Sequence, residues 1–447
     1  MAIVKVHYDA GREWESVRLP GSKSIAARAL VCRYVYGLDT ELVNLPDCDD
    51  TIELSEALRR LSERIDKPLL RLEEFGELPP CVMEFNLGNG GTSLRFFVAL
   101  AASLPGLTAY VDCAPGLKRR PLAPLLDELR HHGAEIECLE RPGYAPLKIT
   151  GRRLTGNELT VSSRQSSQFL SALLMASPLW DIKGAPIVPD VTVSKPYVEM
   201  TRKVMESFSK SPERYEIEAD WSAASYFYEL ALAVPGRKLY IENLTDAEHS
   251  IQGDSETQNI FAFLGVGTHR AEDSATGAVL EGDARATRAL ADTGMSLRLD
   301  MGDTPDLVPA LAVGMCLAGI PYVFENVGAL RVKESDRLQA LCAELHKAGF
   351  AVHVADDIAG DGAPMPRETP TVSLVWKGQR YPVADDETFE AWNAHRIAMA
   401  ISILATRLGW LGIKDGEAVA KSFPGFYNEL GRLGFKITMV RKTMKWK

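Results

Sequence analysis

The sequence has no C-x-x-C pair, and its seven cysteines are scattered along the chain. An odd, dispersed set of this kind argues against a disulfide framework and against a structural zinc site. It suits a reducing compartment, so we expect a cytoplasmic protein without a bound metal.

Long apolar runs and targeting signals are also missing. The longest uncharged stretch, residues 307–324, contains two prolines and two glycines, which favours a buried helix followed by a strand over a membrane span. Residues 1–6 are typical of a strand and lack the architecture of a signal peptide. We therefore expect a soluble chain with no membrane partner.

The chain lacks an excess of positive charge, because its 50 Lys and Arg residues are outnumbered by 60 Asp and Glu residues, which gives a net charge of −10. This balance argues against a nucleic-acid partner. Lys and Arg nevertheless gather where helices are expected to begin, at Lys23, Arg95, 118–120, Lys195 and 331–337. The free N–H groups of a helix start, combined with basic side chains, make a good anion site. We infer a ligand, or a pair of ligands, that carries several phosphate or carboxylate groups.

No long Gly/Ser linker divides the chain, although 447 residues are too many for one ordinary core and favour two domains. Helical periodicity alternates with short β-like pieces, a pattern typical of the α/β class. About two candidate helices occur in every stretch of roughly 70 residues, which indicates a repeated supersecondary unit. The interior boundary is expected near residues 211–220, and the segments 268–290 and 355–385 are expected to be rich in loops.

Taken singly, several of these features have simple structural explanations. Ser22 and Ser194 could be helix N-caps, residues 90–91 a tight turn, and Asp306 a carboxylate that a helix dipole favours. Arg120 could belong to a solvated charge run. These explanations do not account for the accumulation of cations at so many helix starts.

Eleven motifs resemble, in the same order, those of the 5-enolpyruvylshikimate-3-phosphate synthase family of enolpyruvyl transferases. Together they extend over essentially the whole chain, which makes the match far more specific than any one piece. The motifs are LPGSKSIAARAL at 19–30, LGNGGTSLRF at 87–96, KRRPLAPLLDELRHHGAEI at 118–136, SSQFLSALLMASP at 166–178, SKPYVEMTRKVM at 194–205, EADWSAASYF at 218–227, QGD at 252–254, PDLVPALA at 305–312, RVKESDRL at 331–338, HR at 395–396 and AKSFPGF at 420–426.

The resemblance implies a two-domain inverse α/β barrel in which each domain contains three βαβαββ units. Residues 21–218 would form the N-terminal domain. Residues 1–20 and 219–447 would form a discontinuous C-terminal domain, because the first strand would join the C-terminal half. The active site would lie in the interdomain cleft, which ligand binding would close. A monomer that needs no cofactor is also implied.

The reaction that the resemblance implies moves the enolpyruvyl group of phosphoenolpyruvate to the 5-hydroxyl of shikimate 3-phosphate and releases phosphate. Both substrates are anionic, so holding them close together requires neutralising cations. Proton transfer requires an acid and a base. Asp306 matches the acceptor of the hydroxyl proton and Glu334 the donor to C3, with Lys23 as the third catalytic candidate. The split of proton roles among these three residues stays open.

By the same resemblance, two overlapping sets of residues would bind the substrates. The shikimate 3-phosphate set is Lys23, Ser24, Arg28, Ser166, Ser167, Gln168, Ser194, Tyr197, Asp306 and Lys333. The phosphoenolpyruvate set is Lys23, Asn89, Gly91, Arg120, Gln168, Arg337, Arg396 and Lys421. Glyphosate occupies the phosphoenolpyruvate site in this family, and Gly91 leaves room for it, so sensitivity to glyphosate is expected.

Three residues depart from the family pattern. Ala394 stands where an Asp is usual, Ala329 where an Asn is common, and Phe96 where a proline often occurs. Every expected cation and both proton-transfer carboxylates are retained, so we expect an active enzyme. The effect of these three residues on activity and on glyphosate sensitivity stays open.

Two alternatives also stay open. UDP-N-acetylglucosamine 1-carboxyvinyltransferase shares the implied fold and typically carries a reactive cysteine in its N-terminal half, where this chain has Cys113. The motifs at 166–168 and 194–197 speak against that substrate. A non-catalytic anion-binding relative is the second alternative, suggested by Ala394 and Ala329.

Overall fold

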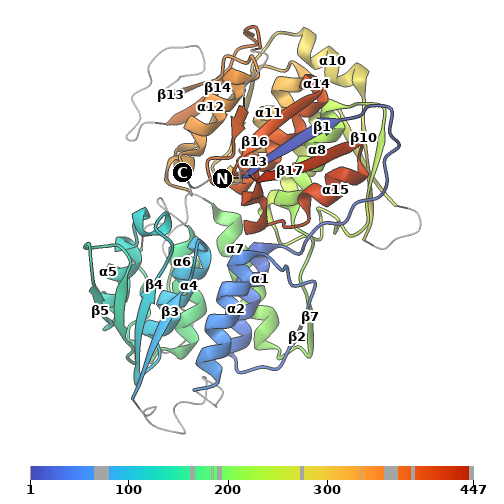
Figure 1. The fold of residues 1–447 in the computed structure, drawn as a ribbon. Helices are drawn as coiled ribbons and strands as arrows, with labels where there is room; N and C mark the ends of the chain where they lie inside the picture. The colour runs from blue at the N-terminus through green and yellow to red at the C-terminus, as the bar shows by residue number, and fades with distance from the viewer. Residues whose placement is uncertain are drawn as a thin grey trace. The chain divides into compact units, whose positions relative to one another are not determined.

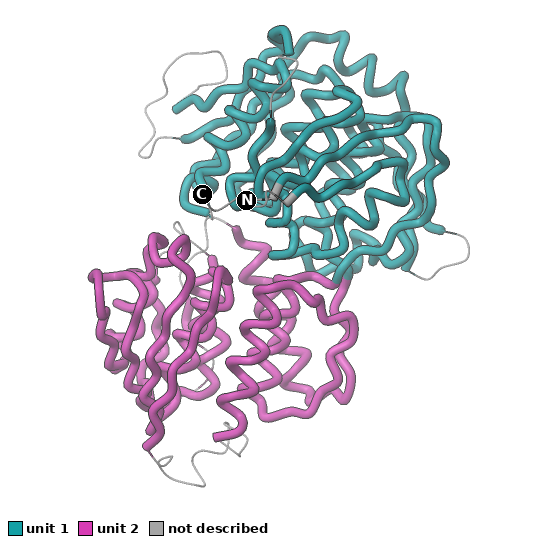
Figure 2. The backbone as a smooth tube through the Cα atoms, in the orientation of Figure 1, with its two compact units in different colours: residues 1–20, 219–447 teal, residues 21–218 magenta. Residues whose placement is uncertain are grey.

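The protein forms two compact units, which Figure 2 distinguishes by colour. Unit 1 comprises Met1–Pro20 and Ala219–Lys447, and unit 2 comprises Gly21–Glu218. The computed structural model describes residues 2–64, 80–161, 167–182, 184, 186–188, 194–271, 276–333, 335–356, 371–383 and 388–441.

Unit 2 is a mixed α/β structure with one four-stranded sheet of order β3-β4-β6-β5 and a two-stranded sheet, β2-β7. Strands β3 and β4 are parallel, whereas β6 is antiparallel to both β4 and β5. With α4 and α5 as the connections, this is the βαβαββ topology. The elements are α1 (Lys23–Val35), β2 (Glu41–Val43), α2 (Asp49–Ser62), β3 (Cys81–Asn86), α4 (Gly91–Ala102), β4 (Leu107–Asp112), α5 (Ala123–His131), β5 (Glu135–Cys138), β6 (Leu147–Thr150), α6 (Ser167–Ala176), α7 (Lys195–Ser209) and β7 (Arg214–Glu216).

Unit 1 is also mixed α/β and contains two four-stranded sheets and one three-stranded sheet. Its helices are α8 (Trp221–Ala233), α9 (Thr257–Phe263), α10 (Ala284–Asp292), α11 (Val308–Ala318), α12 (Arg337–Lys347), α13 (His395–Ile403), α14 (Ala405–Leu408) and α15 (Phe426–Arg432). Its strands are β1 (Ala2–Tyr8), β8 (Lys238–Ile241), β9 (Val266–Arg270), β10 (Ala278–Gly282), β11 (Leu297–Asp300), β12 (Tyr322–Glu325), β13 (His353–Asp356), β14 (Val372–Trp376), β15 (Thr388–Glu390), β16 (Trp410–Lys414) and β17 (Phe435–Arg441).

The topology of unit 2 recurs twice in unit 1. The sheet β11-β12-β14-β13 has the same strand directions, with α11 and α12 as connections. In the sheet β15-β16-β1-β17, the N-terminal strand β1 pairs with both β16 and β17 and fills the place of the missing fourth strand. The expected α/β class is confirmed. In the described ranges the complete βαβαββ topology occurs once in unit 2 and twice in unit 1, whereas three units were expected in each domain. The strands of the described ranges lie in separate sheets and do not close into one ring.

Three helices in each unit pack against one another and are largely buried; Figure 1 labels all six. In unit 2, α1, α4 and α6 contact one another, and in unit 1, α8, α11 and α13 do so. These helices are buried on nearly every side, as expected for helices that are apolar all round. All six begin at or beside residues of the motifs described above, so the core of each unit determines where those residues lie.

One expectation about the loops is wrong. The segment 268–290 contains β10 and most of α10 instead of an extended loop. The start of α10 is fixed by Asp283, whose carboxylate accepts hydrogen bonds from the backbone N–H groups of Arg285 and Ala286. This N-cap outweighs the glycines at 277 and 282 that suggested a loop.

All seven cysteines are free thiols. In the described part of the chain, no group of three or more His, Cys, Asp or Glu side chains is arranged to hold a metal ion. None of the described helices has both the length and the apolar character that crossing a membrane would require.

Candidate active site

The first cluster of candidate residues lies in unit 2, where α1 begins. Lys23 is the first residue of α1, and its Nζ lies 2.7 Å from Asp50 Oδ2 at the start of α2. The exposed fractions of these two side chains are only 17% and 10%. The Ser22 hydroxyl makes no capping hydrogen bond, so the simple N-cap explanation does not hold. Asp50 was not among the predicted site residues.

Next to this pair lies the glycine-rich start of α4. A Cβ atom on Gly91 would stand 2.4 Å from Arg120 Nη1, and Arg95 Nη1 donates to the Gly91 carbonyl at 2.7 Å. Gly91 therefore allows two guanidinium groups to approach the backbone closely. Gln168 Nε2 donates to Thr92 Oγ1 at 2.8 Å and so joins the start of α6 to that of α4. The predicted residues Gly91, Arg120 and Gln168 are brought together in unit 2.

An acidic side chain backs the same loop. The carboxyl oxygens of Glu53 occupy the space beside Gly88, and the backbone N–H of Asn89 hydrogen-bonds to Glu53. Burial, reinforced by the negative charges of Asp50 and Asp49, raises the pKa of Glu53 to about 7, although the Asn89 hydrogen bond opposes the shift. Glu53 therefore changes charge in the physiological range.

Arg28 lies deeper in unit 2 than the predicted ligand role suggests, with only 1% of its surface exposed. Its guanidinium donates to Thr201 Oγ1 at 2.8 Å, to the Ser24 carbonyl at 2.8 Å and to the Tyr197 carbonyl at 3.1 Å. The Phe96 ring centroid is 5.3 Å from its Cζ. Burial lowers the pKa of Arg28 to about 10, so it stays charged at neutral pH. In this structure Arg28 links α1 to α7.

Two predicted serines flank this region. Ser167 is the first residue of α6 and is buried. Ser194, just before α7, has a left-handed backbone with φ of 55° and makes no side-chain capping bond. Its N-cap explanation therefore fails as well. The predicted residues Ser166 and Glu334 lie outside the described part of the chain.

The second cluster lies in unit 1 around Asp306, just before α11. Arg337 Nη1 donates to Asp306 Oδ1 and Arg396 Nη2 donates to Asp306 Oδ2, each at 2.8 Å. Lys333 Nζ lies 3.7 Å from Oδ1. The carboxylate is therefore engaged with cations from α12 and α13 and is not simply a helix-start acid. Four predicted residues meet here.

Lys421, also in unit 1, is the last residue of a short 3-10 helix that precedes α15. Its Nζ donates to the backbone carbonyl and to the side-chain Oδ1 of Asn393, at 2.7 and 2.9 Å. Ala394, which replaces the usual Asp, is fully buried at the N-cap position of α13. Asn393 thus supplies two oxygens to the lysine in a segment where the family carboxylate is missing.

Asp254 is a site neighbour that sequence reasoning missed. It is buried, its carboxylate accepts a hydrogen bond from the Ser222 hydroxyl, and burial followed by the charge of Asp306 raises its pKa to about 6, against the opposing effect of Arg396. Asp254 and Ser222 both lie in motifs of the family, at 252–254 and 218–227, but neither was assigned a role. Their pairing connects α8 to the segment before α9.

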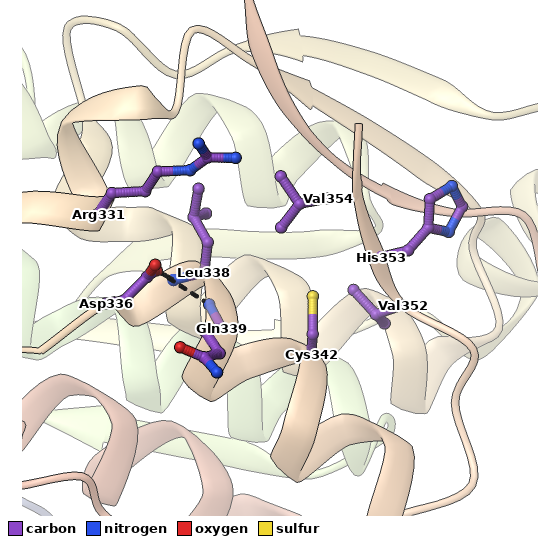
Figure 3. A pocket seen from close by; sticks show the side chains of 8 residues that line it. All are labelled: Arg331, Asp336, Leu338, Gln339, Cys342, Val352, His353 and Val354. Atoms are coloured by element: carbon purple, nitrogen blue, oxygen red, sulfur yellow. Dashed lines mark hydrogen bonds between the residues drawn. The ribbon is translucent and has the colours of Figure 1, made fainter. Parts of the chain in front are cut away.

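A separate surface pocket of about 410 Å³ lies on unit 1 between α12 and β13 (Figure 3). It contains none of the predicted ligand residues. Its walls are Arg331, Asp336, Leu338, Gln339, Cys342, Val352, His353 and Val354.

Comparison with known proteins decides the family. A sequence model described as EPSP synthase (3-phosphoshikimate 1-carboxyvinyltransferase) matches residues 13–211 and 209–430. The chain belongs to the EPSP synthase family. Curated relatives named 3-phosphoshikimate 1-carboxyvinyltransferase include one from Bacteroides fragilis, 32% identical with 94% of this chain and 96% of the relative covered. Another, from Syntrophobacter fumaroxidans, is 34% identical with 93% and 96% covered.

Solved structures support the EPSP synthase fold. EPSP synthase from Acinetobacter baumannii matches with a TM-score of 0.67 over 98% of this chain and all of its own, at 18% identity. The enolpyruvyl transferase NikO from Streptomyces tendae matches with a TM-score of 0.63 over 98% of this chain and 99% of its own, at 15% identity. At these identities the likeness concerns the fold alone.

Proposed function

We propose that the protein is a 3-phosphoshikimate 1-carboxyvinyltransferase, which transfers the enolpyruvyl group of phosphoenolpyruvate to the 5-hydroxyl of shikimate 3-phosphate. The observation that carries the proposal is the set of cationic and polar side chains at the starts of the buried helices in a chain of the EPSP synthase family. The starts of α1, α4 and α6 combine free backbone N–H groups with Lys23 and Arg120, an arrangement that suits phosphate and carboxylate groups. We assign the reaction to the shikimate pathway.

Within this proposal, unit 2 supplies most of the shikimate 3-phosphate ligands: Lys23, Ser24, Arg28, Ser166, Ser167, Gln168, Ser194 and Tyr197. Phosphoenolpyruvate would be bound by Lys23, Asn89, Gly91, Arg120 and Gln168 together with Arg337, Arg396 and Lys421 of unit 1. The short Gly91–Arg120 approach and the paired arginines on Asp306 support this assignment. Planar guanidinium groups are well suited to carboxylate and phosphate oxygens.

The proposed chemistry proceeds by addition and elimination. Asp306, with Lys333 beside it, accepts the proton of the 5-hydroxyl group. The oxygen of that hydroxyl group then forms the bond to C2 of phosphoenolpyruvate. C3 receives a proton from an acid, for which Glu334 and Lys23 are the candidates. Elimination then removes a proton from C3 and releases inorganic phosphate. No oxidation or reduction occurs, and no cofactor is required.

The properties of Cys113 help to decide between the two candidate acceptor substrates. This residue is buried, and burial, reinforced by the neighbouring Asp112 charge, raises the pKa of its thiol to about 11. A reactive cysteine needs a lowered pKa and access to solvent, so Cys113 lacks the properties that the alternative enzyme would require. This favours shikimate 3-phosphate over UDP-N-acetylglucosamine.

A phosphate-release assay with each acceptor tests the proposal. We expect phosphoenolpyruvate-dependent release with shikimate 3-phosphate and none with UDP-N-acetylglucosamine. The reverse result would refute the choice of acceptor. Calorimetric binding of shikimate 3-phosphate without any turnover would support the non-catalytic alternative instead.

We further infer that the protein acts as a cytoplasmic monomer. The scattered free thiols suit a reducing compartment. Light scattering after size exclusion should give a mass near the 49.1 kDa of one chain. A stable mass of twice that value would contradict the inference.

A further inference from the structure

Glu344, in the third turn of α12, is a fully buried carboxylate with donors on several sides. Its Oε1 accepts a hydrogen bond from Trp392 Nε1 at 2.8 Å, and its Oε2 accepts one from the Glu390 backbone N–H at 3.0 Å. Lys347 Nζ lies 3.0 and 2.9 Å from the two oxygens. Two of these bonds join α12 to the segment that includes the end of β15 and the turn after it.

The same face of α12 carries a predicted substrate ligand. Arg337 begins the helix and holds Asp306. Seven residues separate Arg337 from Glu344, which corresponds to about two helical turns, so the two side chains project from the same face. One side of α12 therefore holds Asp306 at its start and the turn before α13 further along. Figure 3 shows that Gln339 and Cys342 of α12 line a pocket that contains neither Arg337 nor Glu344.

The turn that Glu344 holds has an unfavourable backbone. Trp392 and Asn393 are consecutive non-glycine residues with φ of 54° each. Such left-handed conformations are rare, above all for a bulky residue, and persist where the surroundings fix them. The hydrogen bonds from Trp392 and Glu390 to Glu344 contribute to that constraint, together with those from Lys421 to Asn393.

This turn leads directly into the phosphoenolpyruvate side of the proposed site. Asn393 presents two oxygens to Lys421, and α13 starts two residues later with His395 and Arg396. Arg396 then reaches Asp306. A shift of the turn would therefore displace Arg396 and Lys421 together.

We propose that Glu344 is a positioning residue for phosphoenolpyruvate binding, an inference that rests on the proposed function. By fastening α12 to residues 390–392, its carboxylate fixes the spacing between Arg337 at the start of α12 and Arg396 in α13. It also holds the turn whose Asn393 accepts the hydrogen bonds of Lys421. A carboxylate with two hydrogen-bond-accepting oxygens is needed, because donors approach both. A purely structural role would lower stability without a preference for one substrate.

The first test is Glu344→Gln, which keeps the shape but replaces one accepting oxygen by an NH₂ donor. That donor would face either the Trp392 or the Glu390 N–H group, so the turn must move. We expect the KM for phosphoenolpyruvate to rise about 10- to 100-fold, since a displacement of about 1 Å has effects of that size. The KM for shikimate 3-phosphate should change by less than about threefold.

Trp392→Phe provides a milder second variant, because it keeps the buried ring and removes only the N–H donor. The same preference for phosphoenolpyruvate is expected, with a smaller rise in KM. In the double variant the effects should combine to less than their product, because both remove one interaction. If Glu344→Gln does not fold, an unchanged phosphoenolpyruvate KM in Trp392→Phe is enough to reject the proposal.

Glu128→Gln in unit 2 is the matched control. Glu128 is also buried, and its oxygens accept hydrogen bonds from the Thr160 N–H and hydroxyl groups, each at 2.7 Å. No predicted ligand residue contacts it through these bonds. We expect a lower melting temperature with unchanged KM values. A phosphoenolpyruvate effect in Glu128→Gln equal to that in Glu344→Gln would overturn the proposal.

A measurement without turnover separates this inference from the proposed function. The indole N–H signal of Trp392, assigned by its loss in Trp392→Phe, should shift in the ¹⁵N NMR spectrum of Glu344→Gln. An unmoved signal would reject the interaction itself. Wild-type protein that releases no phosphate would instead refute the proposed function, whatever the indole signal shows.

Discussion

Arg396 Nη2 donates a hydrogen bond to Asp306 Oδ2 at 2.8 Å, although 90 residues separate the two in the sequence. Arg337 and Lys333 approach the other oxygen, so one carboxylate faces three cations. The excess positive charge attracts anions. We expect an anionic substrate to compete for the arginines, which would free the Asp306 oxygens to accept a proton from a hydroxyl group.

Replacement of Asp306 tests this arrangement directly. Asp306→Asn keeps the shape but removes the base and the negative charge, so kcat should fall by about 10²–10⁴-fold. Binding of shikimate 3-phosphate, measured by calorimetry, should largely persist, because most of its proposed ligands lie in unit 2. Asp300→Asn, at an exposed position of β11, is the control and should behave like the wild type. Unimpaired turnover in Asp306→Asn would reject the proton-transfer assignment.

Gly91→Ala should weaken phosphoenolpyruvate binding. The new Cβ would stand 2.4 Å from Arg120 Nη1, and the flexible guanidinium would move away. We expect the KM for phosphoenolpyruvate to rise about tenfold or more. Glyphosate, which should inhibit the wild type, should inhibit the variant less.

Gly116→Ala is the matched control for this change. Gly116 precedes Arg120 in the same basic loop, its φ of −65° suits alanine, and a Cβ there would meet nothing within 4 Å. Its kinetics should equal those of the wild type. A wild-type phosphoenolpyruvate KM in Gly91→Ala would show that the close approach of Arg120 has no functional importance.

The raised pKa of Glu53 predicts a pH-dependent stability of unit 2. In the unfolded chain the carboxyl loses its proton near its ordinary pKa of 4.5, whereas in the folded protein it keeps it up to about 7. Between these values the folded state binds more protons, so the free energy of unfolding falls as pH rises and then levels off. Glu53→Gln removes this dependence. The melting temperature of the variant, relative to that of the wild type, should therefore rise between about pH 5 and about pH 8.

Glu84→Gln, on the exposed side of β3, serves as the control for the Glu53 experiment. Its melting temperature should follow that of the wild type across the same pH series. Parallel curves for wild type and Glu53→Gln would mean that Glu53 is already ionised at low pH in the folded protein.

Cys113→Ala should leave turnover within about twofold of the wild type, because a thiol with a pKa near 11 is protonated at neutral pH and is a poor nucleophile. In the native protein, peptide mapping after maleimide treatment at neutral pH should show slow modification of Cys113. Fast modification, or a loss of activity of about 100-fold in the variant, would revive the cysteine-dependent alternative.

Local signals in the sequence predicted the helix starts and the repeat well. Caps, glycines and periodicity act over a few residues, and α1, α7 and α12 begin at Lys23, Lys195 and Arg337, which lie at positions expected to be helix starts. The miss at 268–290 has a local cause too, since the N-cap at Asp283 was overlooked.

Partners that the fold brings together could not be predicted in the same way. Asp50 lies 27 residues from Lys23, and Asp254 lies 32 residues from Ser222. No local pattern in either segment identifies its distant partner, because these contacts depend on how the helices pack. Glu344 shows the same limit, since its neighbours at 390–392 are 46 and 48 residues away.

The sequence predicts that Arg28 binds substrate, whereas in the structure its guanidinium links buried helices. Replacement of Arg28 distinguishes the ligand role from the structural role. The guanidinium is buried and bonded to α1 and α7, and its Nη2 also lies 3.3 Å from Ser171 Oγ in α6. Arg28→Ala would leave a cavity between three helices, at a cost of about 2–5 kcal/mol.

The melting temperature of Arg28→Ala should therefore fall by at least about 4 °C, whereas Arg33→Ala, at the end of the same helix, should change it little. Thr201 and Ser171 would keep their mutual hydrogen bond of 2.9 Å, so the loss would come from the cavity and from the unlinked helices. If Arg28 acts mainly as a ligand, the wild-type melting temperature would be retained while the affinity for shikimate 3-phosphate, measured by calorimetry, collapses. A fall in both would mean that the same guanidinium holds the helix bundle together and orders the phosphate-binding helix starts. The helices α1 and α6 begin at proposed ligands of that substrate, and the proposed ligand Ser194 directly precedes α7.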